Sequence, residues 1–311
     1  MFALIPLLSL LPSALSAPLF GLSLGATSDP ASGTPTPVSL ETVNATLLRP
    51  AQFARVAYCS SASITSWSCG GPCEVLGNVT FLQSGGGTSL PTSHFIAHDA
   101  DDQSLVVAHE GTDSKNMQAL SILNDAQFGL VDLNATRFPQ TAESIQVHSG
   151  FQDTFERTAD GLLAGVMAGL ASTGVKKVSV TGHSLGAAIA TMTGAMIKAA
   201  VDPSVEVTVT GFGLPRGGNQ EWADFLDKNV GVTFVSNQHD PVPTVPPRFL
   251  GFQHSSGEIH IVDDSQTNLV ACPGQDNENC ATGNSLIAAD VGNHKGPYFD
   301  DISFGHSACP A

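Results

Sequence analysis

The sequence predicts an α/β fold, in which helices cover both faces of a mostly parallel central sheet. One observation is that short β-branched apolar runs alternate with longer runs of helical periodicity, as strands joined by crossover helices do. A second is the strand-like run 178–181, which passes through Gly182-His183-Ser184-Leu185-Gly186 directly into the helix-forming run 187–192. With 311 residues, 42% of them hydrophobic, the chain is long enough to bury one large core.

The individual elements follow from the apolar pattern and from the residues that interrupt it. An acidic turn at 99–102 separates two apolar runs, which predicts a pair of strands. Apolar side chains recur near one face of 151–171, which predicts an amphipathic helix; they are Phe151, Phe155, Leu162, Val166 and Leu170. The expected elements, in chain order, are a helix at 51–58, strands at 92–99, 104–108, 127–133 and 144–147, the helix at 151–171, a strand at 177–181, a helix at 187–200, a strand at 206–212, a helix at 219–228, and strands at 231–237 and 259–262.

Composition divides the chain into three parts. Residues 1–17 have the pattern of a secretory signal peptide, because 2–11 is almost entirely apolar and small residues follow it, although no Lys or Arg precedes Arg49. Residues 18–40 are rich in Pro, Gly, Ser, Thr and Ala, which predicts a flexible pro-segment or linker, or a plain disordered extension. Residues 41–311 are expected to form a single domain. No apolar run is long enough for a transmembrane segment.

The six cysteines are typical of an oxidising, extracellular destination. Fifteen pairings are possible. Two local loops and one long closure match the positions, which favours Cys69–Cys73, Cys272–Cys280 and Cys59–Cys309. Their spacing, with that of the histidines, makes no four-ligand zinc site, so no metal is expected.

Charge and short acceptor motifs also bear on function. The formal net charge of −16 disfavours nucleic acid and anionic membranes as partners, is compatible with a neutral substrate, and favours solubility. Asn-X-Thr tripeptides at Asn44, Asn78 and Asn134 are candidate glycosylation sites in a secreted chain.

Ser184 is the candidate nucleophile. A sharp turn from a strand into a helix holds a serine in a strained conformation, and glycines such as Gly182 and Gly186 remove side chains that would strike the neighbouring strand and helix. The motif alone is weak, because an inert serine in a Gly-rich turn has the same pattern. Its weight depends on whether partners for the serine occur elsewhere in the chain.

The partners of such a serine are an acid and a histidine that follow it in that order. Asp240 follows the predicted strand 231–237 and precedes Pro241, which places a carboxylate at the rim of the sheet. Asp202 lies in a loop, and Asp224 and Asp227 lie on a predicted helix. Among the later histidines we favour His294, in a turn-rich loop, as the base. His306 is the remaining candidate, whereas His254 lies in a polar loop and His260 in a strand.

An ester or amide hydrolase also needs two donors for the oxyanion. The N–H of Leu185, the residue after the nucleophile, is one candidate. Thr112 is the other, because the apolar strand 106–108 runs through Gly111 into this residue; an ordinary strand-ending turn is the alternative.

At this point the chain resembles the fungal class 3 triacylglycerol lipase family. The resemblance runs from about residue 52 to 309 and rests on the segments 106–112, 147–151, 180–188, 211–219, 240–243 and 294–299. It implies the α/β-hydrolase fold, the triad Ser184, Asp240 and His294, the oxyanion donors Thr112 and Leu185, and the three disulfides named above. One departure is Glu110, where the family often has Arg.

The resemblance further implies a short helical lid at about 113–126. It would carry Met117, Leu120, Ile122 and Leu123 over the site, and we group His183, beside the serine, with these substrate-contacting residues. An ordinary surface helix is the alternative for this segment. The expected activity is a secreted, cofactor-free, monomeric lipase that hydrolyses acylglycerols at an oil–water interface. The alternatives are a feruloyl or other soluble-ester esterase of the same fold, a secreted serine peptidase and a non-enzymatic binding protein.

Overall fold

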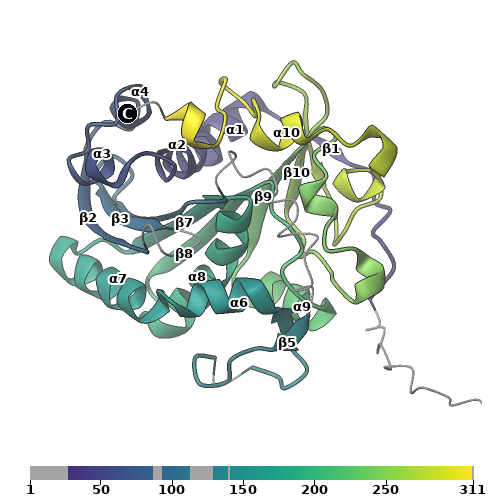
Figure 1. Ribbon diagram of the computed structural model, residues 1–311, viewed down its shortest axis with the longest axis horizontal. Helices are drawn as coiled ribbons and strands as arrows, with labels where there is room; N and C mark the ends of the chain where they lie inside the picture. Colours follow the sequence, from purple (N-terminus) through teal and green to yellow (C-terminus); the bar gives the residue numbers. More distant parts are fainter. Residues whose placement is uncertain (1–26, 87–92, 113–128, 139–140, 310–311) are drawn as a thin grey trace, which may run out of the picture.

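The computed structural model describes residues 27–86, 93–112, 129–138 and 141–309 of the chain, and its central feature is a nine-stranded sheet (Figure 1). The middle strands, from β10 to β4, run parallel, and the strands at both edges run antiparallel. The order across the sheet is β1 (Thr36–Val38), β11 (Leu269–Cys272), β10 (Glu258–Ile261), β9 (Val232–Asn237), β8 (Glu206–Phe212), β7 (Lys177–His183), β4 (Ser104–His109), β3 (His94–Asp99) and β2 (Val79–Gly85). The predicted mostly parallel sheet is confirmed.

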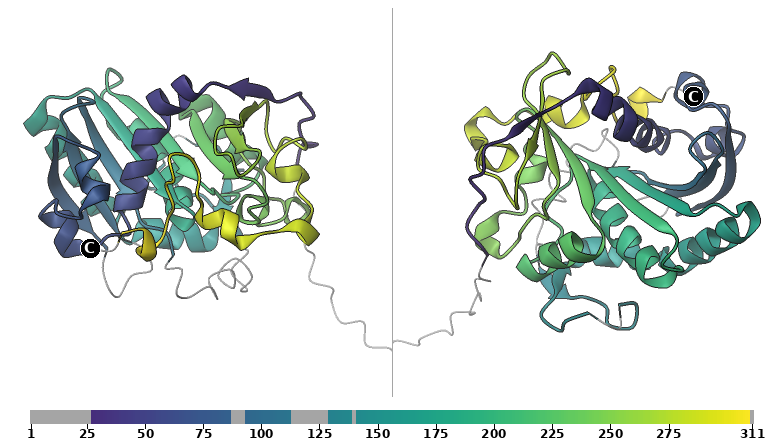
Figure 2. Two further views of the ribbon diagram at one scale, coloured as in Figure 1. Left: turned by 90° about the horizontal axis from the view of Figure 1, so that it is seen from above. Right: turned by 180° about the vertical axis from the view of Figure 1, so that it is seen from behind.

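Helices cover both faces of this sheet, as Figures 1 and 2 show. One face carries α1 (Leu40–Thr46) and α2 (Leu48–Val56), with the short α3 (Ser61–Thr65) and α4 (Gly71–Glu74) beside them. The other face carries α7 (Ala159–Thr173), α8 (Leu185–Ala200) and α9 (Gln220–Asn229), with α6 (Ser149–Glu156) packed on α8. In the described part of the chain, no helix has the length and apolarity that a membrane crossing requires.

Strand alternation explains why the sheet can be buried on both sides. Val178 and Val180 of β7 lie in the core beneath α8, whereas Ser179 and Thr181 point to the opposite face. Thr181 donates a hydrogen bond to the carbonyl of Pro50 in α2, which satisfies its hydroxyl inside the protein. A small two-stranded sheet, β5 (Leu130–Asp132) with β6 (Gln146–His148), lies apart from the main one.

Two predicted segments differ most from the structure. The helix predicted over 151–171 is two helices, α6 and α7, because α6 packs on α8 whereas α7 continues along β2 and β3. Arg137 stabilises the break, since its guanidinium bonds Glu156 at the end of α6 and Asp160 at the start of α7, both at 2.9 Å.

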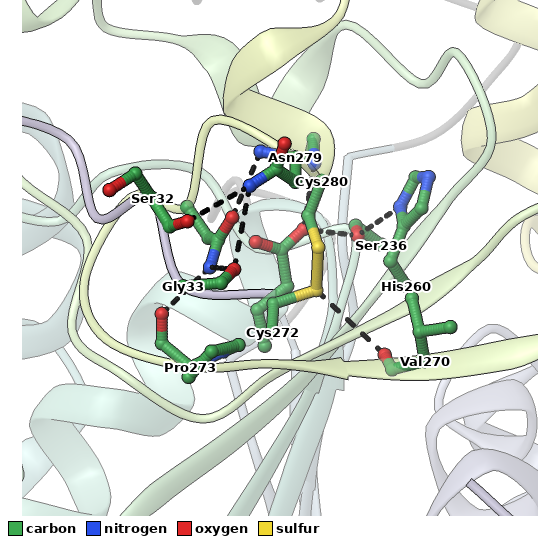
Figure 3. Close-up of a disulfide and its surroundings, with 12 residues drawn as sticks. Ser32, Gly33, Ser236, His260, Val270, Cys272, Pro273, Asn279 and Cys280 are labelled. Atoms are coloured by element: carbon green, nitrogen blue, oxygen red, sulfur yellow. Dashed lines mark hydrogen bonds between the residues drawn. A yellow bond between two sulfur atoms is a disulfide. The ribbon is translucent and has the colours of Figure 1, made fainter. Parts of the chain in front are cut away.

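The linker predicted over 18–40 ends earlier than expected. Thr36–Val38 is edge strand β1, and the side-chain amide of Asn277 donates to the carbonyl of Gly33 at 2.9 Å. The side-chain amide of Asn279 donates to the carbonyl of Ser32 at 3.3 Å (Figure 3). The backbone of Ala31 also pairs with Gln275 and Glu278. The pairing of backbone groups therefore holds this segment, although its composition is that of a linker.

The three disulfides pair as predicted: Cys59–Cys309, Cys69–Cys73 and Cys272–Cys280. The first joins the end of the α2 segment to the C-terminal region, and the third closes the loop that holds the strap of residues 31–38.

The three candidate glycosylation sites differ in access. Asn44 is exposed on α1. The side-chain amides of Asn78 and Asn134 donate to Asp101 and Glu156, so a glycan there would replace a hydrogen bond. We therefore expect Asn44 to be the best acceptor.

Candidate active site

The turn from β7 into α8 places Ser184 at the carboxyl edge of the sheet. Its backbone is strained, with φ +58° and ψ −127°, a conformation that costs free energy unless the surroundings enforce it. Both flanking glycines are needed for close approach. A Cβ on Gly182 would collide with the carbonyl of Gly186, and a Cβ on Gly186 would collide with the backbone of His109 and Glu110.

Ser184, His294 and Asp240 form one hydrogen-bonded chain. The Ser184 Oγ lies 2.8 Å from His294 Nε2, and His294 Nδ1 lies 2.9 Å from Asp240 Oδ2. Asp240 is 1% exposed, and its other carboxylate oxygen accepts the N–H of Val242 at 2.8 Å. The three side chains come from the ends of β7 and β9 and from the short helix α10 (Val291–Lys295), and only the fold brings them together.

Side-chain hydrogen bonds to the main chain hold the helix that carries His294. The amide of Asn237, at the end of β9, donates to the carbonyls of Asn293 and Pro297 at 2.9 and 3.1 Å. A Cβ on Gly213, whose φ is +56°, would come within 2.8 Å of the His294 ring. Thus Gly213 leaves the space in which the imidazole stands.

The two candidate oxyanion donors lie on either side of the serine. Leu185 is the first residue of α8, whose N-terminal N–H groups are not used within the helix. Gly111 packs so closely that a Cβ there would collide with the His183 carbonyl and come within 3.3 Å of Ser184 Cβ. The backbone N–H of Thr112, the next residue, therefore lies close to the nucleophile. The predicted lid residues Met117, Leu120, Ile122 and Leu123 lie outside the described residues.

His183 does not contact substrate space, contrary to our expectation. Its side chain is buried, 4% exposed, beneath the triad. The ring lies between the hydroxyl of Tyr58 and the backbone carbonyl of His294. The burial explains the difference: His183 is the last residue of β7, and its ring packs inside the protein, whereas the serine after it stands on the turn into α8.

The rejected candidates have other partners. His306 Nδ1 donates to the carbonyl of Tyr58 at 2.8 Å, and its Nε2 lies 3.2 Å from Glu110 Oε1. His254 is buried and stacked on Phe234, and His260 is buried and bonded to Ser236. Asp202 caps its own turn, and Asp224 and Asp227 contact Gln275 at the surface.

Comparisons with known proteins identify the family of this chain. Residues 106–250 match the class 3 lipase family. A secreted mono- and diacylglycerol lipase of Malassezia globosa is 34% identical over 241 residues, which cover 76% of this chain and 77% of that protein. The chain belongs to the class 3 lipase family.

Further relatives show how far the likeness extends. A secreted mono- and diacylglycerol lipase of Malassezia restricta is 36% identical over 194 residues, so the match spans 61% of each chain. Lipase II from Rhizopus niveus has a TM-score of 0.77 at 21% identity, covering 88% of this chain and 99% of that one. The Lip2 lipase from Yarrowia lipolytica has a TM-score of 0.74 at 24% identity, with the same coverage. These structures establish the α/β-hydrolase fold.

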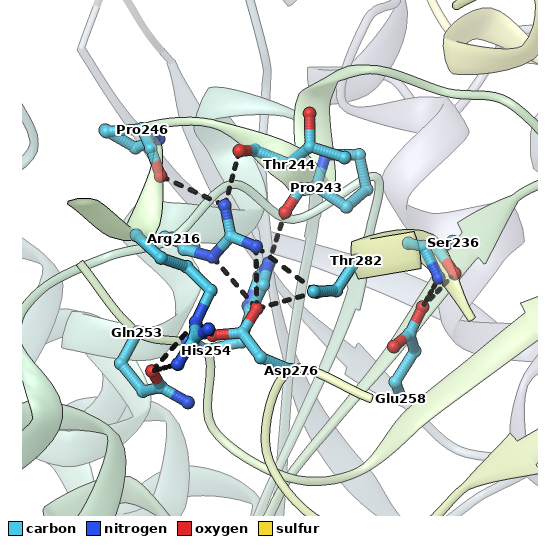
Figure 4. Close-up of polar contacts among 12 residues, drawn as sticks. Arg216, Ser236, Pro243, Thr244, Pro246, Gln253, His254, Glu258, Asp276 and Thr282 are labelled. Atoms are coloured by element: carbon cyan, nitrogen blue, oxygen red, sulfur yellow. Dashed lines mark hydrogen bonds and ion pairs between the residues drawn. The ribbon is translucent and has the colours of Figure 1, made fainter. Parts of the chain in front are cut away.

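This class 3 lipase also holds a buried ion pair between Arg216 and Asp276 (Figure 4). Asp276 accepts Arg216 Nη2 and Nε at 2.7 and 2.9 Å, Thr282 Oγ1 at 2.8 Å and the N–H of His254 at 3.0 Å. Arg216 also donates to the carbonyls of Thr244 and Pro246, in the loop that follows Asp240. Sequence reasoning missed this role of Arg216, although the residue lies in the 211–219 segment that carries the resemblance.

We expect Asp276→Asn to lower the free energy of unfolding by about 3–5 kcal/mol, because it leaves a buried guanidinium unpaired. Burial opposes ionisation of Asp276, but Arg216 outweighs it and lowers the pKa from 3.8 to about 2. The contribution of ionised Asp276 to the free energy of unfolding is thus complete above pH 3.8, and it is lost as the pH falls through about 2. Urea unfolding measures the loss. Asp160→Asn, at an exposed ion pair, is the control, and an equal loss there would contradict the prediction.

A second buried carboxyl in this lipase fold carries the opposite pH dependence. Burial raises the pKa of Glu258 from 4.5 to about 7, while Ser236 and the N–H of Ala281 donate to it. The folded state therefore holds a proton that the unfolded chain releases, so this group makes the free energy of unfolding fall as the pH rises from 4.5 to about 7.

We expect Glu258→Gln to remove that slope. Relative to the wild type, the variant should be more stable at about pH 8 than at about pH 4, because only the wild type must ionise a buried carboxyl. Chemical denaturation at the two pH values measures the difference. Exposed Glu221→Gln on α9 should show the same stability difference from the wild type at both pH values. A pH-independent effect of Glu258→Gln would refute the interpretation.

Proposed function

We propose that this protein is a secreted carboxylic ester hydrolase that cleaves acylglycerols through an acyl-enzyme. The observation that carries the proposal is the continuous chain from Ser184 through His294 to Asp240, at 2.8 and 2.9 Å, with the serine on a strained turn. Hydrogen bonds of this length place the base where it can take the hydroxyl proton. Membership of the class 3 lipase family supports the same reaction.

The geometry accounts for each step. His294 Nε2 takes the proton of Ser184 while Oγ attacks the ester carbonyl, and the carbonyl electron pair moves onto oxygen. The N–H groups of Leu185 and Thr112 stabilise that oxyanion. When the C–O bond breaks, His294 gives the proton to the departing alcohol. Water then attacks the acyl-enzyme by the same relay and releases the fatty acid. Asp240 orients the imidazole and stabilises its charged form.

Substrate class, compartment and assembly follow from the relatives and from the chain. The Malassezia relatives are named secreted mono- and diacylglycerol lipases, so we propose export, and partial acylglycerols as the first substrates to test. Three disulfides fit an oxidising compartment. The triad is complete within one chain, which supports a monomer as the active unit.

Two measurements test the proposal. An organophosphate should inactivate the enzyme and add its phosphoryl group to Ser184, detected by peptide mass spectrometry, and an unlabelled Ser184 would refute the mechanism. Rates on emulsified acylglycerols should rise steeply above the solubility limit. A preference for soluble short-chain or feruloyl esters would instead identify an esterase, and turnover of casein a peptidase. Chromatography of the products shows which acylglycerol is cleaved first.

A further inference from the structure

His183 is the residue before the nucleophile, and its buried ring contacts the main chain of the base, His294. Its Nε2 lies 2.8 Å from the backbone carbonyl oxygen of His294, and its Nδ1 lies 2.7 Å from the hydroxyl of Tyr58. A carbonyl oxygen can only accept a hydrogen bond, so Nε2 carries the proton. A neutral ring then accepts at Nδ1, which makes the Tyr58 hydroxyl the donor.

The ring is held neutral and in place by its surroundings. Burial, and then the neighbouring His294, lower the pKa of His183 well below 6.5. The ring stacks on Phe304, with centroids 4.4 Å apart and planes 15° apart. A neutral ring 4.5 Å from the His294 ring adds no repulsion when His294 takes up a proton during the reaction.

The same carbonyl of His294 accepts a second hydrogen bond, from the Tyr298 hydroxyl at 3.2 Å. The helix that carries His294, α10, has five residues, too few to be stable in isolation. Its position therefore depends on such contacts. Tyr58 extends the connection further, because its hydroxyl packs against Gly111, the residue before Thr112.

We infer that His183 is a positioning residue, whose neutral ring bridges Tyr58 to the main chain of His294 and so sets the distance between the base and Ser184. This inference rests on the proposed function, because it concerns the efficiency of the same proton relay. His183 precedes Ser184 in the chain, so one strand end holds both partners of the hydrogen bond that the reaction uses.

The test compares two substitutions of similar size. His183→Leu fills the space without a donor, and His183→Gln keeps an amide N–H that can reach the His294 carbonyl. We expect His183→Leu to lower kcat by about 10- to 100-fold, with KM changed by less than about threefold, since substrate contacts stay intact. His183→Gln should recover most of the loss. His94→Gln, at another buried histidine that touches no triad residue, should keep kcat within about twofold.

A second measurement does not depend on activity or on the folding of a variant. Nitrogen chemical shifts of the wild-type histidine rings should report a neutral His183 with its proton on Nε2. A proton on Nδ1, or a charged ring at neutral pH, would overturn the inference. So would an unchanged kcat in His183→Leu, or equal losses in the Leu and Gln variants. Activity that survives Ser184→Ala would refute the proposed function itself, whereas an unaffected His183→Leu beside an inactive Ser184→Ala would refute this inference alone.

Discussion

Replacing Ser184 with alanine is expected to lower kcat by at least about 10⁴-fold, the largest effect that any single substitution in this chain should have. The Oγ atom 2.8 Å from His294 Nε2 is the only group of the triad placed to form the acyl-enzyme. Its loss removes the covalent route, while the remaining donors still bind and polarise the ester. Initial rates on an acylglycerol emulsion measure the effect, together with the loss of organophosphate labelling.

Ser179→Ala is the matched control for this substitution. Ser179 lies on the same strand, β7, but its side chain lines a cavity between the sheet and α2, away from the triad. It should retain wild-type kcat and labelling. Substantial hydrolysis by the Ser184→Ala variant, with a wild-type Ser179→Ala, would mean that another residue attacks the ester.

Asp240→Asn is expected to lower kcat by about 10³- to 10⁴-fold with little change in substrate binding. The structure explains why an isosteric amide should fail. Asp240 Oδ1 accepts the N–H of Val242 at 2.8 Å, so the amide oxygen of Asn would take that position. Its NH₂ group would then face His294 Nδ1 and donate to it. The imidazole proton would move to Nε2, where it blocks acceptance of the Ser184 proton.

The readout for Asp240→Asn is kcat and KM on the same emulsion, with Asp224→Asn as the control. Asp224 also follows Ser184 in the sequence, but it is exposed on α9 and contacts Gln275. Its variant should be fully active. Loss of activity in Asp224→Asn with an active Asp240→Asn would reverse the assignment of the acid.

Local sequence predicted the strong elements of this fold because their signals are local. The run 178–181 and the small residues that follow it predict β7 and α8. Both elements are almost entirely buried, so nearly all of their residues are apolar or small and the pattern is strong. By contrast, β2 and β11 were not predicted. Their side chains are half-buried at best along much of the strand, and pairing with a neighbour rather than their own apolarity makes them strands.

Sequence order, residue chemistry and the family resemblance predicted the triad, the elbow glycines and the disulfide pairs, because each depends on residue type, spacing and family pattern. Only the tertiary structure decided the role of His183, which depends on the side of β7 that its ring faces and on a carbonyl 111 residues away. It likewise revealed Arg216, whose partners come from the segment after Asp240 and from residues 276–282. Contacts between distant segments leave no local pattern in the sequence. Before the chain folds, any of several polar residues could become the partner of Arg216 or His183.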